Sequence, residues 1–220
     1  MFSKNWEKVY KKKNQVSIWP WSDLVTLISR HVLSRKRINN VLELGTGMGA
    51  NIRYFLEKKI DYYGIEGSLS ATKFIKKRHP ILKTKIFNGD FTKKLFTKKK
   101  FDLIIDRGSL THNNHDTIKK TLKLVKKSLK KEGYLICVDW FSKKDSAWKN
   151  AESKNKKYHS IKNIKKGDLK NVGITHFVSY DLIRKMTKGW ELIHCEEKIK
   201  KTLYPNNREQ RAVYSFVLRK

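Results

Sequence analysis

A glycine-rich turn follows a short apolar segment, and this feature restricts the fold more than any other in the chain. The segment at residues 41–44 is expected to be a strand, and it leads into Gly45, Gly47 and Gly49. Glycine permits a tight turn and lets a ligand approach the backbone, and the N-terminus of a following helix can bind an anion. With Ala50, the spacing fits G-x-G-x-x-A, which is typical of turns that bind dinucleotides.

Strands and helices alternate on both sides of this turn. We expect strands at residues 41–44, 61–66, 85–87, 101–106 and 134–139, and helices at about 50–59, 68–79 and 116–130. Such alternation predicts an α/β fold in which a parallel sheet has helices on both faces. A short helix at 180–187 and strands at 190–199 and 212–218 then predict an antiparallel pair on that sheet. Open sheets of this kind bind ligands at the carboxyl ends of their strands.

The 220 residues suit a single domain. Its expected parts are an N-terminal arm and helix at 1–38, a core at 39–139, an insertion at 140–178, and a closing helix and strand pair at 179–220. The insertion is polar and is expected to be irregular. It follows the fifth strand and should therefore lie over the carboxyl ends of the strands.

The net charge of +31 comes from 51 basic and 20 acidic residues. One interpretation is attraction to a polyanion such as nucleic acid or an acidic membrane surface. The other is drift in composition, because 41 of the basic residues are Lys and only 10 are Arg, as in AT-rich coding sequences. The field favours an anionic substrate under both interpretations.

No apolar stretch is long enough to span a membrane, and the first residues lack the apolar core of a signal peptide. Cys137 and Cys195 fit neither a disulfide framework nor a zinc site, and both are expected to be buried thiols. We therefore expect a cytoplasmic protein in a reducing compartment, with no bound metal.

Glu43 stands two residues before Gly45, at the mouth of the turn. A carboxylate there would repel a pyrophosphate, but it would attract a cofactor that carries an ammonium and a sulfonium. S-adenosylmethionine has both groups and no phosphate. A carboxylate that caps a nearby backbone amide is the structural alternative for Glu43.

The run Glu43–Gly49 resembles the first motif of class I S-adenosylmethionine-dependent methyltransferases. Glu66, Asp90 and Asp106 fit further motifs in order and spacing, each at the end of an expected strand. The resemblance covers about residues 40–139. It implies a Rossmann-like, doubly wound, seven-stranded sheet, mostly parallel with an antiparallel C-terminal strand, and S-adenosyl-L-methionine as the cofactor.

The resemblance also implies roles for these residues. Glu66 matches the acid that holds the ribose hydroxyls, and Asp90 the carboxylate beside the adenine amino group, with Phe91 on the ring. Asp90 has a second interpretation, because Asn-Gly-Asp is common turn chemistry. The expected cofactor-binding residues are Glu43, Gly45, Thr46, Gly47, Gly49, Glu66, Gly67, Asp90, Phe91 and Asp106.

Candidate catalytic residues follow the fourth strand. Asp106 is expected to hold the ammonium of the cofactor. His112 is a candidate general base because its ordinary pKa is near neutrality, or else a capping or solvated loop residue. Arg107 either pairs with a carboxylate or phosphate of the substrate, or with an internal acid such as Asp139.

Aromatic side chains near the site are further substrate candidates. Trp19 and Trp21 form either a lid or a hydrophobic staple that ties the arm to the domain. Aromatic and histidine residues in the insertion are Trp148, Tyr158, His159 and His176. An insertion at this point commonly shapes the acceptor pocket in this family. His176 is expected at the substrate, as a second base or as a buried anchor.

The motif Asn/Asp-Pro-Pro-Tyr/Phe, which serves amino-group methylation of nucleic-acid bases, is absent after the fourth strand. The arm and the segment after that strand resemble small methyltransferases of bacterial surface-glycan and acidic-sugar pathways. We therefore predict methyl transfer to O or N of a small anionic metabolite or sugar precursor. The alternative is an RNA methyltransferase that binds phosphates with its basic surface. The acids at positions 43, 66 and 90 argue against a non-enzymatic subunit, and Glu43 argues against a dinucleotide oxidoreductase.

Overall fold

The computed structural model describes residues 4–12, 16–151, 155, 159–167, 169–170, 172–204 and 209–220. Of the residues singled out above, only Tyr158 lies outside the described residues. Among the described helices, none is long and apolar enough to cross a membrane.

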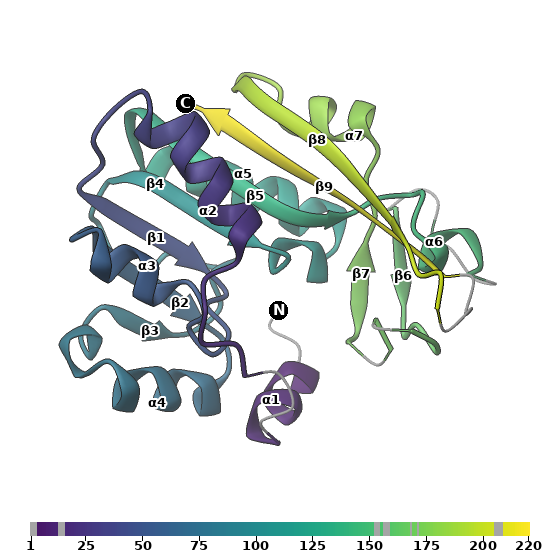
Figure 1. Cartoon of the computed structure of the whole chain (residues 1–220), viewed down its shortest axis with the longest axis horizontal. Coiled ribbons are helices and arrows are strands. Elements are labelled where there is room, and N and C mark those ends of the chain that lie inside the picture. Colours follow the sequence, from purple (N-terminus) through teal and green to yellow (C-terminus); the bar gives the residue numbers. More distant parts are fainter. Residues whose placement is uncertain are drawn as a thin grey trace.

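A seven-stranded sheet forms the centre of the molecule (Figure 1). Its strands, in spatial order, are β3 (Ile86–Asn88), β2 (Asp61–Glu66), β1 (Asn40–Leu44), β4 (Phe101–Arg107), β5 (Leu129–Phe141), β9 (Gln210–Arg219) and β8 (Glu191–Lys201). The first five strands pair in parallel, and β9 is antiparallel to both of its neighbours. The predicted fold class is confirmed.

Helices cover both faces of this sheet. One face carries α2 (Ser22–Ile28) with its π-helical continuation (Ser29–Leu33), α3 (Ile52–Glu57) and α4 (Leu69–Arg78). The other carries α5 (His115–Ser128) and α7 (Tyr180–Met186). Short 3₁₀ turns lie at Pro80–Leu82 and Leu110–His112.

The continuous apolar strands of the sequence are explained by these two layers. Side chains alternate between the faces of a strand, so a strand covered on both sides must be apolar throughout. In β4, Ile104 packs with α5 and α7, whereas Leu103 and Ile105 pack with α2, α3 and α4. Because β1 to β5 are parallel, their carboxyl ends meet at one edge of the sheet, and the site lies there.

The insertion is more ordered than the sequence predicts. It contains α6 (Ser146–Lys149) and an antiparallel pair, β6 (Ser160–Lys162) and β7 (Ile174–His176). Ile161 and Phe177 pack with Phe141 in a small core of their own. The prediction of an irregular insertion was wrong. Strands of three residues are too short to show a periodic apolar pattern in the sequence.

The N-terminal arm forms one helix, α1 (Lys4–Lys11), which packs against α4 beyond the carboxyl ends of β1 and β2 (Figure 1). Glu7 fixes it there, because its carboxylate accepts hydrogen bonds from the hydroxyls of Ser68 and Ser70, both at 2.5 Å. These serines are at the start of α4, where Ser68 also caps the helix by accepting from the backbone N–H of Ala71. The arm therefore covers the edge of the sheet where ligands bind.

Candidate active site

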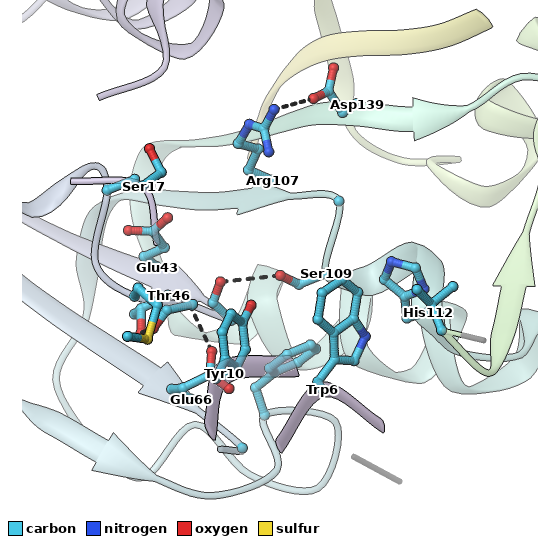
Figure 2. Close-up of a pocket in the computed structure, with 18 of the residues that line it drawn as sticks. Trp6, Tyr10, Ser17, Glu43, Thr46, Glu66, Arg107, Ser109, His112 and Asp139 are labelled. Atoms are coloured by element: carbon cyan, nitrogen blue, oxygen red, sulfur yellow. Dashed lines mark hydrogen bonds and ion pairs between the residues drawn. The ribbon is translucent and has the colours of Figure 1, made fainter. Parts of the chain in front are cut away.

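A cavity of about 570 Å³ lies between the carboxyl ends of the strands, α1 and the insertion (Figure 2). Its volume is within the usual range for small-molecule sites. Most of the predicted cofactor residues line it: Glu43, Gly45, Thr46, Gly47, Glu66, Gly67, Asp90 and Phe91. Gly49 and Asp106 are not among its lining residues.

The glycine turn leaves room that other residues would fill. Gly45 has a φ of +70°, and a Cβ there would lie 2.2 Å from Oγ of Ser109. Gly47 has a φ of +53°, and a Cβ there would lie 3.0 Å from the Tyr10 hydroxyl. Gly49 has a packing role instead, since a Cβ would meet Ile52 at 2.8 Å. The first two glycines thus expose backbone to the cavity.

Glu43 is buried at the bottom of the cavity. Its carboxylate accepts hydrogen bonds from Asn51 Nδ2 at 2.7 Å and from the Tyr62 hydroxyl at 2.5 Å. Burial raises the pKa of Glu43 to about 7, although both hydrogen bonds oppose the shift. A nearby cation would favour its ionised form.

Glu66 bridges the glycine turn and the start of α4. Its two carboxylate oxygens accept from the backbone N–H groups of Gly47, at 2.7 Å, and Ser68, at 2.8 Å. Burial raises the pKa of Glu66 to about 7 against these hydrogen bonds.

The position of Asp90 is consistent with both of its interpretations, a turn-forming residue and a residue that faces a ligand. One of its oxygens accepts from the backbone N–H of Thr92 at 2.9 Å and from its hydroxyl at 2.6 Å, so it does form a turn. It also lines the cavity, as Phe91 does beside it. The turn therefore presents an acid and an aromatic ring to a ligand together.

Asp106 lies behind the cavity wall. One carboxylate oxygen accepts from the backbone N–H groups of Ser109, at 3.1 Å, and Leu110, at 2.9 Å, and the other from Trp140 Nε1 at 2.7 Å. The side chain is fully buried, and burial raises its pKa to about 7. This geometry gives Asp106 a structural position under the 109–110 turn and no open face toward a ligand.

His112 lines the cavity on the side of the insertion (Figure 2). Its Nδ1 lies 3.3 Å from the backbone carbonyl of Ile174, and its ring has edge contacts with Trp6 and Phe141. Burial lowers the pKa of His112 to about 4. The ring is therefore neutral at pH 7. With Nδ1–H donating to the carbonyl, Nε2 keeps a free lone pair.

Of the two partners considered for Arg107, the structure shows the internal acid, Asp139. Nη2 of Arg107 donates to Asp139 at 2.6 Å, and the guanidinium lies 3.6 Å from the ring centroid of Trp21. Arg107, Trp21 and Asp139 all line the cavity. Trp19 does not: it is 60% exposed and contacts Arg53 on the outer surface.

His176 is fully buried and does not line the cavity. Its Nε2 lies 3.3 Å from Nδ1 of His115, and the rings of His115 and His159 flank it. Of its two predicted roles, the buried anchor fits this position and direct contact with substrate does not. Burial lowers its pKa to about 3.

Trp6 and Tyr10 are site residues that the sequence analysis missed. Their rings stack at 5.8 Å, and both line the cavity from α1. Tyr10 lies near both buried acids of the site, Glu43 and Glu66, and its burial raises its pKa. The signal was present as Trp and Tyr four residues apart, which places them on one face of a helix.

These features fit S-adenosylmethionine. The open glycine backbone, Glu66, and the pair Asp90 and Phe91 can take the ribose and adenine parts in the order that the fold expects. Glu43 is a buried acid beside the turn whose ionised form a nearby cation stabilises, which suits a cationic cofactor and disfavours a pyrophosphate.

The comparisons with known proteins agree with this fit. Residues 41–133 match the family model of the methyltransferase domain. The ribosomal RNA small subunit methyltransferase A of Flavobacterium johnsoniae is 30% identical over 102 residues, which cover 44% of this chain and 39% of that protein. The chain thus matches about two fifths of the length of that curated relative.

Solved structures resemble the chain over nearly its whole length. A methyltransferase from Methanosarcina mazei covers 93% of this chain and 99% of its own, at 15% identity and a TM-score of 0.68. The N-methyltransferase NodS from Bradyrhizobium japonicum covers 98% of each chain, at 16% identity and a TM-score of 0.61. CalS10 from Micromonospora echinaspora, an amino pentose methyltransferase, covers 100% of this chain and 98% of its own, at 12% identity and a TM-score of 0.57. At these identities the likeness is one of fold.

Residues 41–133 thus match a methyltransferase domain, and the fold of the chain is that of S-adenosylmethionine-dependent methyltransferases of known structure.

Proposed function

We propose that this protein transfers a methyl group from S-adenosylmethionine to an oxygen or nitrogen of a small anionic metabolite or sugar precursor. The observation that supports this choice most directly is the covered cavity. Its walls include Trp6 and Tyr10 of α1 on one side and Leu169 and Val172 of the insertion on another. Such walls suit an acceptor that enters the molecule rather than a duplex that lies on its surface.

Most of the cavity residues serve to hold the reactants in line. The cofactor supplies a methyl group already activated by a sulfonium. Glu66, Asp90 and Phe91 would bind the nucleoside part, and Glu43 would offset positive charge near the glycine turn. Trp6, Trp21 and Phe141 exclude water and offer flat apolar contacts to the acceptor, so that alignment lowers the barrier.

His112 is the proposed general base. An ammonium must lose a proton before it can attack a methyl carbon, and a hydroxyl must lose its proton as it attacks. The neutral ring, with its Nδ1 side on the Ile174 carbonyl, keeps Nε2 free to accept that proton. Burial lowers the pKa of the ring to about 4, so His112 would act as a weak base. His112→Gln should leave cofactor affinity unchanged and slow methyl transfer at least about tenfold. Full activity of the variant would remove His112 from this role.

The function is tested by incubating the protein with methyl-labelled S-adenosylmethionine and separate panels of sugar phosphates, uronic acids, amino sugars and bulk RNA. Label in one of the small-molecule panels is the expected result. NodS and CalS10 are named as an N-methyltransferase and an amino pentose methyltransferase, which supports including amino sugars. Label in the RNA panel alone would contradict the proposal.

An RNA methyltransferase is the second candidate. It is favoured by the similarity to a ribosomal RNA methyltransferase and by the net charge of +31. If RNA is the acceptor, affinity for bulk RNA should fall by orders of magnitude between about 50 and 200 mM salt, and transfer should fall with it. Under the first proposal, transfer to the small acceptor continues when excess RNA is added.

A further inference from the structure

Two arginine side chains line the acceptor part of the cavity. Arg107 comes from the end of β4 and Arg211 from the start of β9. Each guanidinium lies on an aromatic ring, with Cζ 3.6 Å from the centroid of Trp21 for Arg107 and 4.7 Å from that of Phe141 for Arg211. Stacking of this kind fixes the plane of a guanidinium and leaves its N–H edge available to an anion.

Asp139 interacts with both arginines and has a left-handed backbone conformation. Its φ is +59°, and it stands where the β5–β9 register shifts between Cys137 and Trp140. Asp is among the few residues with a side chain that adopt the left-handed region readily. A bulge of this kind redirects a side chain, and here it turns the Asp139 carboxylate onto Arg107. Arg211 also acts on Asp139 electrostatically.

Among the described residues, both arginines have N–H groups from which no neighbouring carboxylate accepts. Nη2 of Arg107 donates to Asp139, but its Nε is buried without a partner among the described residues. Nε of Arg211 is 4.0 Å from Asp145, which is too far for a hydrogen bond. Asp145 already accepts from the backbone N–H groups of Ala147 and Ala212. A second anionic group in the cavity would satisfy the donors of Arg211, and it would reach those of Arg107 once Asp139 moves away.

We propose that Arg107 and Arg211 form the subsite that binds the anionic group of the acceptor, a phosphate or a carboxylate, and that Asp139 is the internal counter-ion with which that group competes. The inference rests on the proposed function, since it assigns the residues that select the anionic acceptor. Asp139 holds Arg107 in place on Trp21 and is displaced from it when the acceptor enters.

The test measures binding of inorganic phosphate and of malonate by calorimetry, in about 150 mM NaCl so that exposed lysines are screened. The samples contain saturating S-adenosylhomocysteine, whose own binding is measured first. Arg107→Ala and Arg211→Ala should each weaken anion binding about tenfold or more, as expected for lost hydrogen bonds to a charged group. Asp139→Asn should strengthen it, because the competing charge is removed. Asn tolerates the left-handed backbone at this position.

Arg53→Ala is the matched control. Arg53 also lies on a tryptophan, Trp19, at 4.8 Å, but on the outer surface and away from the cavity. Its loss should leave anion affinity unchanged. If Arg107→Ala does not fold, Arg107→Gln and Arg211→Ala provide the same comparison. Tighter binding of phosphate or of malonate identifies which anionic group the subsite prefers.

The proposal is overturned if neither anion binds the wild type, if the arginine variants in the cavity bind like Arg53→Ala, or if Asp139→Asn weakens binding. If the wild type does not bind S-adenosylhomocysteine, this result would instead contradict the proposed function. The two failures are therefore distinguishable in the same samples.

Discussion

Replacing Gly45 by Ala tests how the glycine turn is built. Gly45 has a φ of +70°, which costs a residue with a Cβ about 1–2 kcal/mol. The new Cβ would also lie 2.2 Å from Oγ and 2.6 Å from Cβ of Ser109, and relieving such overlap costs about 1–3 kcal/mol. We therefore expect Gly45→Ala to lower the free energy of unfolding by about 2–5 kcal/mol.

Two matched variants separate these contributions. Gly108→Ala has a similar φ of +65°, but its nearest contact is the Asp139 carbonyl at 3.8 Å, so only the backbone cost of about 1–2 kcal/mol should appear. Ser109→Gly removes the atoms that overlap in Gly45→Ala. The double variant of Gly45 and Ser109 should therefore be less destabilised than the sum of its single variants.

Urea denaturation of the cofactor-free protein measures all four free energies. S-adenosylmethionine binding is measured alongside, and Gly45→Ala should lose it because Gly45 lines the cavity. Equal destabilisation by Gly45→Ala and Gly108→Ala, with strict additivity of the double variant, would refute the steric reasoning.

Three further predictions concern groups whose positions the structure defines. Asp106→Asn should lower the free energy of unfolding in urea by about 1–3 kcal/mol, because an amide cannot accept from all three donors of Asp106. Unchanged stability with lost cofactor affinity would instead make Asp106 a cofactor ligand. Asp90→Ala should weaken S-adenosylmethionine binding about tenfold in calorimetry with little loss of stability, and unchanged affinity would remove its adenine role. His176 has a folded-state pKa of about 3, so the unfolded chain binds more protons between pH 3 and 6.5 and stability falls as pH falls through this window. Wild type should therefore lose about 2 kcal/mol more than His176→Phe between pH 6.5 and 5, and parallel urea midpoints would contradict this shift.

The sequence predicts which residues gather at the glycine-turn side of the cavity, because they follow consecutive strands. Parallel strands bring their carboxyl ends together, so the order of Gly45, Glu66 and Asp90 along the chain already defines their order in space. The same reasoning predicts the two helical layers from the apolar strands. These features depend on local pattern and on a general rule of topology.

The opposite side of the cavity, where we propose that the acceptor binds, could not be predicted in the same way, because there the contacting residues come from distant segments. Asp106 and Asp139 both end apolar strands, yet Trp140 takes the carboxylate of the first and a bulge turns the second into the cavity. The sequence does not show that His176 contacts His115, which lies 61 positions earlier in the chain. Trp6 reaches His112 only because α1 docks on α4 through Glu7.

Calorimetric titration with S-adenosylmethionine, with NAD as the control, tests the central claim most directly. Saturable binding of one S-adenosylmethionine per chain and none of NAD is the predicted result, because the buried acid Glu43 beside the glycine turn favours a cation over a pyrophosphate. Binding of NAD, or of neither ligand, would contradict the account of this site.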